Sequence, residues 1–170
     1  MDANKINVIL NDFEAINPTL YCHSERVAMI AYAFAQELKL EYSEREIAYF
    51  SGMLHDIGKF YLEDVAENDT EEISDQVING SMLYFNNEFS KLIPIISNLQ
   101  INENDSGKYD YNINVIKLII KLADEYDNYR MSGLSHENTC AKIRESNSKN
   151  NNMVTMLFKS IIKNKLNCEY

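Results

Sequence analysis

The sequence predicts an all-α protein, folded as a single compact helical bundle. Two Pro and five Gly in 170 residues are too few for an all-β protein, which needs many turns. Apolar residues recur at helical spacing along most of the chain, and no segment shows the period-2 alternation of a strand. This length suits one domain with a real core, so residues 1–170 are expected to form one domain.

The N-terminal third of the chain predicts three consecutive helices. An apolar stripe indicates the first helix over residues 5–16. Asn17 and Pro18 have the form of an N-cap followed by Pro at the first helical position, so the second helix is predicted from about 18 to 40. The segment 43–46 reads SERE, which has the form of a capping box and predicts the start of the third helix.

The rest of the chain predicts further helices separated by polar, Asn-rich loops around residues 102–112 and 145–152. Pro94 is expected to kink its helix or to lie near the start of that helix. One helix is predicted to begin at Thr70, and another to cover residues 89–99. A long helix is predicted from an Asn112 cap to about residue 131, and the last two helices cover about 135–145 and 152–166. The N-terminal helix and the two C-terminal helices are expected to pack on the helices between them.

Charge and apolar content exclude two classes of partner. The net charge is −10, and no clustered basic run is present, so duplex nucleic acid is not an expected partner. A small phosphorylated ligand is still compatible, because a bound cation can supply positive charge locally. No stretch reaches the roughly 18 uncharged apolar residues of a membrane span, and the acidic N-terminal segment is unlike a signal peptide.

The cysteines indicate a reducing compartment. Cys22, Cys140 and Cys168 are odd in number, far apart and without a CxxC pair, so reduced thiols in a cytoplasmic protein are expected. Cys22 stands beside His23, but an ordinary semi-buried thiol is a better interpretation of Cys22 than a metal ligand.

Two histidines and two aspartates stand where apolar stripes turn them inward. His23 shares one helical face with the apolar residues that follow it. The third helix leads to His55 and Asp56 at its end, where two consecutive side chains can turn toward one point. Asp124 continues an apolar stripe at the same helical spacing. Simpler interpretations exist. His23 would be a core histidine with satisfied hydrogen bonds, and His55 and Asp56 would form a surface pair. Asp124 would mark the point where its apolar stripe reaches the surface.

Together these four residues form a coherent ligand set for one divalent metal ion. Imidazole nitrogen and carboxylate oxygen suit Mn, Fe, Co, Ni, Zn or Mg, with water in the open positions. Such a site lowers the pKa of water and polarises a phosphoryl oxygen. A buried aspartate also needs a cation or another partner.

Other polar residues are given other interpretations. Asp127 is expected to lie at the surface or to support the ligands from behind. His136 is expected to be an exposed turn residue near a helix start at Ser135.

The same residues carry a family resemblance. His23, His55-Asp56 and Asp124 match the H…HD…D signature of the HD-domain superfamily of helical, metal-dependent phosphohydrolases. The segments HSERVAMIAYAFAQEL, AYFSGMLHDIGK and IIKLADEYDN resemble the main blocks of an HD-GYP domain, the cyclic-di-GMP phosphodiesterase branch, over about residues 18–132.

This resemblance implies roles for the individual residues. His23, His55, Asp56 and Asp124 would be the metal ligands, and Asp56 and Lys59 would be catalytic. Lys59 would also contact a substrate phosphate. Some single-metal HD hydrolases have a catalytic carboxylate after the HD pair, so by this resemblance Asp64 or Glu63 could serve as a general base. Arg26, one turn after His23, is a weaker candidate for anion contact, and a surface ion pair explains it equally well.

The chain also departs from the HD-GYP pattern. HD-GYP domains carry further histidines between the HD pair and the final Asp, and these hold a second or third metal. No histidine occurs here from Phe60 to Ala123, and Gln76 stands where one of them is expected. The four-ligand site is therefore expected, and cyclic-di-GMP hydrolysis by the usual route is not.

Three functions are compatible with these residues. The favoured one is a metal-dependent phosphohydrolase that acts on a nucleotide or another phosphorylated small molecule. The alternative is a catalytically inactive, degenerate HD-GYP module that binds a nucleotide or a protein partner in signalling. That partner would be a second copy of the chain or a separate signalling protein. A purely structural network of His and Asp without metal ranks last, because four such residues are costly in a core.

Overall fold

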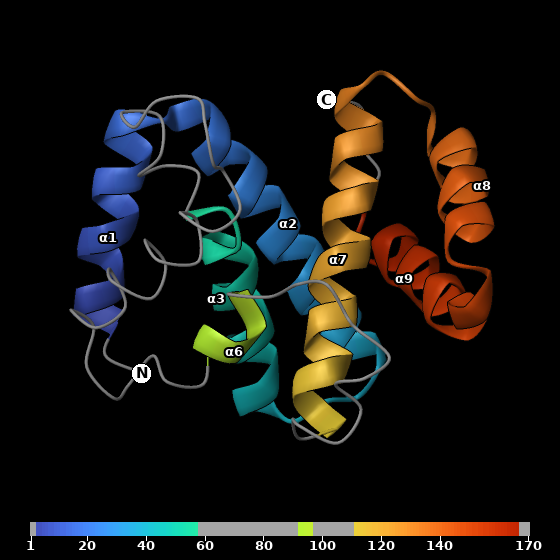
Figure 1. The fold of residues 1–170 in the computed structure, drawn as a ribbon, viewed down its shortest axis with the longest axis horizontal. Helices are drawn as coiled ribbons and strands as arrows, with labels where there is room; N and C mark the ends of the chain where they lie inside the picture. Colours follow the sequence, from blue (N-terminus) through green and yellow to red (C-terminus); the bar gives the residue numbers. More distant parts are fainter. Residues whose placement is uncertain (1–2, 58–91, 97–110, 167–170) are drawn as a thin grey trace, which may run out of the picture.

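The computed structural model describes residues 3–57, 92–96 and 111–166, and within these ranges every regular element is a helix (Figure 1). The predicted all-α class is confirmed. The elements are α1 (Ala3–Ile16), α2 (Pro18–Glu37), α3 (Tyr42–Leu54), α6 (Ile93–Ile96), α7 (Tyr111–Met131), α8 (His136–Ser146), a 3-10 turn (Ser148–Asn150) and α9 (Asn151–Lys163).

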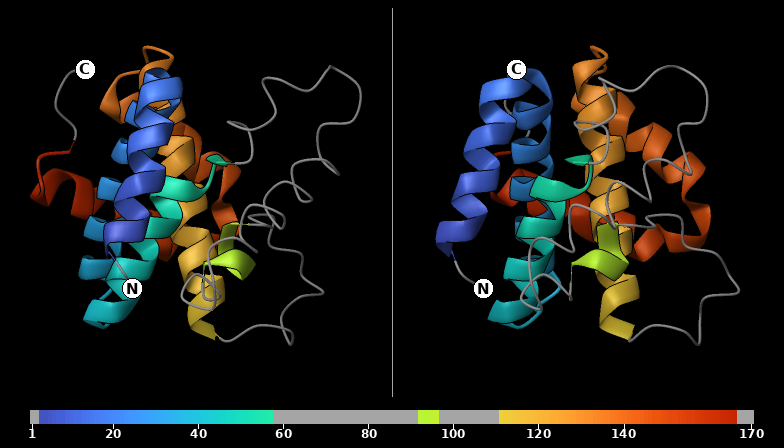
Figure 2. Two further views of the ribbon diagram at one scale, coloured as in Figure 1. Left: turned by 90° about the vertical axis from the view of Figure 1, so that its left-hand side faces the viewer. Right: turned by 60° about the vertical axis from the view of Figure 1, so that its left-hand side comes forward.

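Helix α2 is central to the arrangement. It packs against α1, α3, α7 and α9, while α8 packs on α7 and α9. Figures 1 and 2 show α1 on one side of α2 and the α7–α8 pair on the other. Because α2 contacts both α3 and α7, side chains from these three helices can meet at one place.

Two apolar clusters hold the helices together, and α2 contributes to both. The larger cluster joins α2 to α7, α8 and α9, and Phe34, Ile120 and Leu157 are fully buried in it. The smaller one contains Ala28 of α2 and Met53, Leu54, Ile57, Leu92 and Ile96 of the α3 and α6 segments. The clusters fix α3 and α7 against α2 by burial of apolar surface.

The start of α2 follows its predicted cap. The Asn17 side-chain oxygen accepts a hydrogen bond from the backbone N–H of Leu20 at 3.0 Å, and Pro18 is the first helical residue. The helix ends at Glu37, three residues before the predicted end at about 40. Lys39 has a φ of 59°, a left-handed conformation that a helix cannot continue through.

The predicted start of α3 is wrong by two residues. The N-cap is Glu41, in an extended conformation, and its N–H donates to the Glu44 carboxylate at 2.9 Å. Ser43 therefore lies inside the first turn. The capping pattern is present, but a glutamate occupies the cap position instead of the serine that the sequence motif suggested.

The cap predicted for α7 is also wrong. The helix begins at Tyr111, so Asn112 is its second residue, and the Asn112 amide donates to the Glu44 carboxylate of α3. This residue links two helices. Pro94 is the second residue of α6, near its start, which is one of the two predicted placements. The helix predicted from Thr70 and most of 89–99 lie outside the described residues.

Other sequence expectations concern single residues. The Ser135 hydroxyl caps α8 by accepting from the N–H of Asn138 at 3.2 Å, as predicted. Cys22 is exposed and not semi-buried, while Cys140 is buried.

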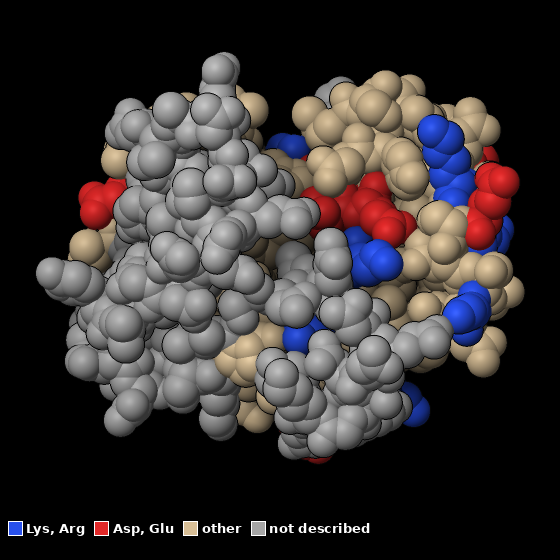
Figure 3. Space-filling model, viewed as in Figure 1, with Lys and Arg blue, Asp and Glu red and all other residues tan. Residues whose placement is uncertain are grey.

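Among the described helices, none is long and apolar enough to cross a bilayer. Acidic and basic side chains are interspersed on the described part of the face in Figure 3.

Helices α2 and α3 approach each other closely at Gly52. A Cβ atom built on Gly52 would lie 2.7 Å from the Cα of Ala28 and 2.9 Å from its backbone nitrogen. Only glycine permits this approach of the two backbones. The contact is three residues from His55 and brings the end of α3 against α2.

Candidate metal centre

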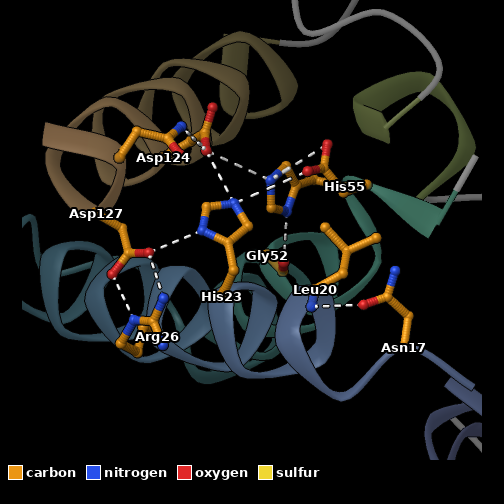
Figure 4. A network of polar contacts seen from close by, with 10 residues as sticks. Asn17, Leu20, His23, Arg26, Gly52, His55, Asp124 and Asp127 are labelled. Atoms are coloured by element: carbon orange, nitrogen blue, oxygen red, sulfur yellow. Dashed lines mark hydrogen bonds and ion pairs between the residues drawn. The ribbon is translucent and has the colours of Figure 1, made fainter. Parts of the chain in front are cut away.

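Four predicted ligand side chains converge where α2, α3 and α7 meet. His23 comes from α2, His55 and Asp56 directly follow α3, and Asp124 comes from α7. The Nε2 atom of His23 lies 3.1 Å from Asp124 Oδ1 and 3.8 Å from Asp56 Oδ2. The Nε2 atom of His55 lies 3.6 Å from an oxygen of each aspartate. Figure 4 shows both imidazole rings and Asp124 facing the same point.

These separations suit one ion. His23, His55 and Asp56 each offer a ligand atom, and the three atoms lie within 4.8 Å of one another. Ligand atoms at roughly 2.0–2.2 Å from a metal lie about 3 to 3.5 Å from each other. Asp124 completes the set through its short distances to both imidazoles. Small movements of the side chains are therefore sufficient to surround a divalent cation.

The ring of His55 is oriented by the end of α3. Its Nδ1 donates to the carbonyl oxygen of Gly52 at 2.8 Å, one of the last carbonyls of the helix, which have no partner within it. A carbonyl only accepts, so the proton is on Nδ1, and in the neutral ring Nε2 carries the lone pair. Nε2 is buried, with no hydrogen-bond partner among the described residues.

That buried nitrogen is the test of whether the residues fit a metal. A buried polar atom without a partner is costly, and nearly all such atoms in folded proteins have one. The Nε2 of His55 points to the carboxylates of Asp56 and Asp124, which are themselves suitable oxygen ligands. A divalent cation among these atoms would satisfy the nitrogen and both carboxylates, so the residues fit the ion.

The ring of His23 is oriented from α7. Its Nδ1 donates to Asp127 Oδ2 at 2.8 Å, which leaves Nε2 on the side of Asp124. Asp127 is fully buried, so its predicted surface position is wrong, and the alternative of support from behind the ligands agrees with this contact. Arg26 forms an ion pair with Asp127, and this pair is partly buried, because Asp127 has no exposure while the Arg26 side chain is 24% exposed.

The carboxylates change the protonation of His23. Burial alone lowers the pKa of His23, but hydrogen bonds to Asp124 and Asp127 outweigh burial and raise it to about 9. Burial raises the pKa of Asp124, yet its contacts with both imidazoles hold it well below its ordinary value. Asn128 also donates to Asp124, at 2.7 Å. Without metal, a proton on His23 therefore occupies the position that a cation would take.

We expect metal binding to displace this proton. A metal ligand must be a neutral imidazole, so at pH 7.5 about one proton should be released per cation bound. Calorimetric titration with Mn²⁺ in two buffers of different ionisation enthalpy measures the number released. Identical binding enthalpies in the two buffers would contradict a protonated His23. His136→Ala, which changes a histidine outside the site, should leave the proton count unchanged.

The same pKa sets the stability of the metal-free protein. The folded-state pKa of His23 lies above its unfolded value of 6.5, so its contribution is complete below about pH 6.5. The contribution is lost as the pH rises through about 9. In the presence of chelator, the protein should therefore unfold at a lower temperature at pH 9.5 than at pH 6.5.

Three of the residues singled out from the sequence lie outside the described residues: Lys59, Glu63 and Asp64. His136 is described but takes no part in this cluster. His136 is not an exposed turn residue: it is half-buried at the start of α8, with Nδ1 2.8 Å from the Tyr126 hydroxyl. Burial lowers its pKa. The prediction failed because the spacing of apolar residues in α8 does not show that α7 packs beside His136.

Sequence reasoning missed one contributor. The Gly52 carbonyl orients His55. The sequence feature that could have indicated this contact is the position of Gly52, three residues before a histidine at a helix end. The support from Asp127 was foreseen only as one of two alternatives. Its signal was the i+3 spacing from Asp124, which places both carboxylates on the same side of α7.

Comparison with known proteins agrees with the fold. The family model of the HD domain matches residues 20–129, which is more than half of the chain and includes all four converging residues. The chain belongs to the HD-domain family. No curated protein and no solved structure matches it. The match does not distinguish the HD-GYP branch, so that finer resemblance stays a prediction.

Proposed function

We propose that the protein is a metal-dependent phosphohydrolase that acts on a phosphate ester of a nucleotide-like substrate. The observation that carries the proposal is the buried Nε2 of His55, which faces two carboxylates and has no hydrogen-bond partner among the described residues. Membership of the HD-domain family supports the same class of activity.

The chemistry follows from the arrangement of the four ligands. His23 and His55 would hold a divalent cation through their Nε2 atoms, since each Nδ1 is hydrogen-bonded elsewhere. The cation would supply a Lewis acid that polarises a phosphoryl oxygen and lowers the pKa of water. The side chain of Asp124 is 32% exposed, against 1% for His55, so substrate approaches from the side of Asp124.

Asp56 is proposed to have a second role beside metal binding. One of its oxygens faces His55 and the other faces His23, so one can bind the cation while the other accepts a proton from water. Lys59 is proposed to neutralise charge on the substrate phosphate. Two imidazoles and two carboxylates suit Mn, Fe, Co, Ni, Zn or Mg.

A second function is an inactive module that binds a nucleotide or a protein partner. The absence of histidine from Phe60 to Ala123 favours it, because those histidines hold the additional metals in HD-GYP domains. Under this alternative the four ligands would hold a cation that only stabilises the fold. Turnover measurements separate the two functions.

Hydrolysis of a nucleotide panel tests the proposal. With Mn²⁺, Co²⁺, Ni²⁺ or Mg²⁺, the wild-type protein should release phosphate or a monoester from at least one nucleotide, cyclic dinucleotide or generic phosphodiester. Asp56→Asn should lower the rate by about 10²- to 10⁴-fold, because it removes the proton acceptor.

A matched control is available on α7. Glu125 is the neighbour of Asp124, but its carboxylate accepts from the Asn147 amide at 2.8 Å. Glu125→Gln exchanges the same kind of group outside the site and should keep the wild-type rate. If Asp56→Asn retained full turnover, the proton-accepting role of Asp56 would be rejected. If no substrate turned over while Mn²⁺ bound, the hydrolase proposal would be rejected.

A further inference from the structure

A partly buried ion pair lies behind His23, on the side of the ring that faces away from the ligand atoms (Figure 4). Asp127 accepts three hydrogen bonds there. His23 Nδ1 donates to Oδ2 at 2.8 Å, Arg26 Nε donates to Oδ1 at 2.7 Å, and Arg26 Nη2 donates to Oδ2 at 2.9 Å. Both oxygens of the carboxylate are therefore engaged.

The pair connects the same two helices that carry the ligands. Arg26 follows His23 by one turn of α2, and Asp127 follows Asp124 by one turn of α7. Asp127 is fully buried, while the Arg26 side chain is 24% exposed. A buried carboxylate is costly unless several donors satisfy it, and the guanidinium supplies two donors in a rigid fork.

We propose that Asp127 and Arg26 are positioning residues for the metal centre. Asp127 keeps the proton of the metal-binding form of His23 on Nδ1 and directs Nε2 toward the cation. Arg26 acts through Asp127, because it holds both carboxylate oxygens in place. This inference rests on the proposed metal site. It assigns Arg26 a role different from the anion contact that the sequence suggested.

A carboxylate behind a metal-binding histidine has a measurable effect. Loss of such a partner costs about 10- to 100-fold in metal affinity. An amide at position 127 would present an N–H toward one of the three donors, since an amide has a single acceptor oxygen. Asp127→Ala is the cleaner change, because it introduces no opposing donor.

The test compares Mn²⁺ affinity in three variants by calorimetry. Asp127→Ala should bind Mn²⁺ about 10- to 100-fold more weakly than wild type, and Arg26→Gln should show a smaller loss, of roughly tenfold or less. Glu37→Gln is the matched control. It removes an α2 carboxylate that pairs with Lys159 and Lys163 of α9, away from His23, and should leave the affinity unchanged.

A second measurement separates positioning from a general structural role. The chain has three histidines, so the imidazole ¹⁵N spectrum of the Zn²⁺-loaded protein is simple. Wild type and Glu37→Gln should show a protected Nδ1 proton on His23. That signal should be lost in Asp127→Ala, whereas mere destabilisation would leave it in the folded fraction.

The outcomes distinguish this inference from the function on which it rests. If wild type binds no Mn²⁺, the metal site itself is rejected. If wild type binds Mn²⁺ and both variants bind as tightly as Glu37→Gln, only the positioning inference is overturned. Should Asp127→Ala fail to fold, Arg26→Gln decides: weaker Mn²⁺ binding supports the inference and unchanged binding overturns it.

Discussion

Replacing His55 with alanine should abolish the stabilisation that divalent cations give to the native protein. His55 contributes a buried Nε2 atom that faces both aspartates, and its ring is held by the Gly52 carbonyl. A ligand that binds only the native state adds about 2.7 kcal/mol at 100 times its Kd. For a chain of this length, that corresponds to a rise in Tm of roughly 5–10 °C.

Thermal unfolding with Mn²⁺ and with chelator measures this stabilisation directly. Wild type should unfold several degrees higher with Mn²⁺, and His55→Ala should unfold at the same temperature in both conditions. His136→Ala is the matched control, because His136 contacts Tyr126 and not the ligand cluster. It should be destabilised in both conditions yet keep the full metal-dependent shift. A wild type indifferent to chelator would favour a metal-free network.

Gly52→Ala should strongly destabilise the protein, although it adds only one methyl group. The new Cβ would lie 2.7 Å from the Cα and 2.9 Å from the nitrogen of Ala28, so α3 would be pushed away from α2. Forced overpacking of this kind costs about 3 kcal/mol. Because the Gly52 carbonyl also orients His55, Mn²⁺ affinity should fall together with stability. Urea unfolding with chelator and calorimetry measure the two effects separately.

Two controls identify the cause. Gly133 has a φ of 88° and open space around it, so Gly133→Ala should show only backbone strain of about 1 kcal/mol and unchanged Mn²⁺ affinity. Ala28→Gly combined with Gly52→Ala should restore little, because the two shortest contacts are with the backbone of Ala28. Full recovery in that double variant would show that the side chain of Ala28 was the obstacle.

The sequence alone was sufficient for the fold class and for the membership of the cluster. Helical spacing of apolar residues predicted the helices, and the Asn17–Pro18 pair predicted the first residue of α2. The same spacing placed His23 and Asp124 on inward faces, and His55 and Asp56 at a helix end. These four side chains do meet, because the inward faces of packed helices share one core. Their roles as metal ligands stay a prediction.

Only the tertiary structure decided which atoms meet. The hydrogen bond between His23 and Asp127 joins residues that are 104 positions apart in the sequence, and the one between Arg26 and Asp127 joins residues 101 positions apart. Asn112 contacts Glu44 and does not cap its helix, and His136 is covered by Tyr126. Periodicity reports which face of a helix is buried, because burial follows from local spacing. The partner of each polar atom depends on how distant helices pack, and no local pattern encodes that geometry.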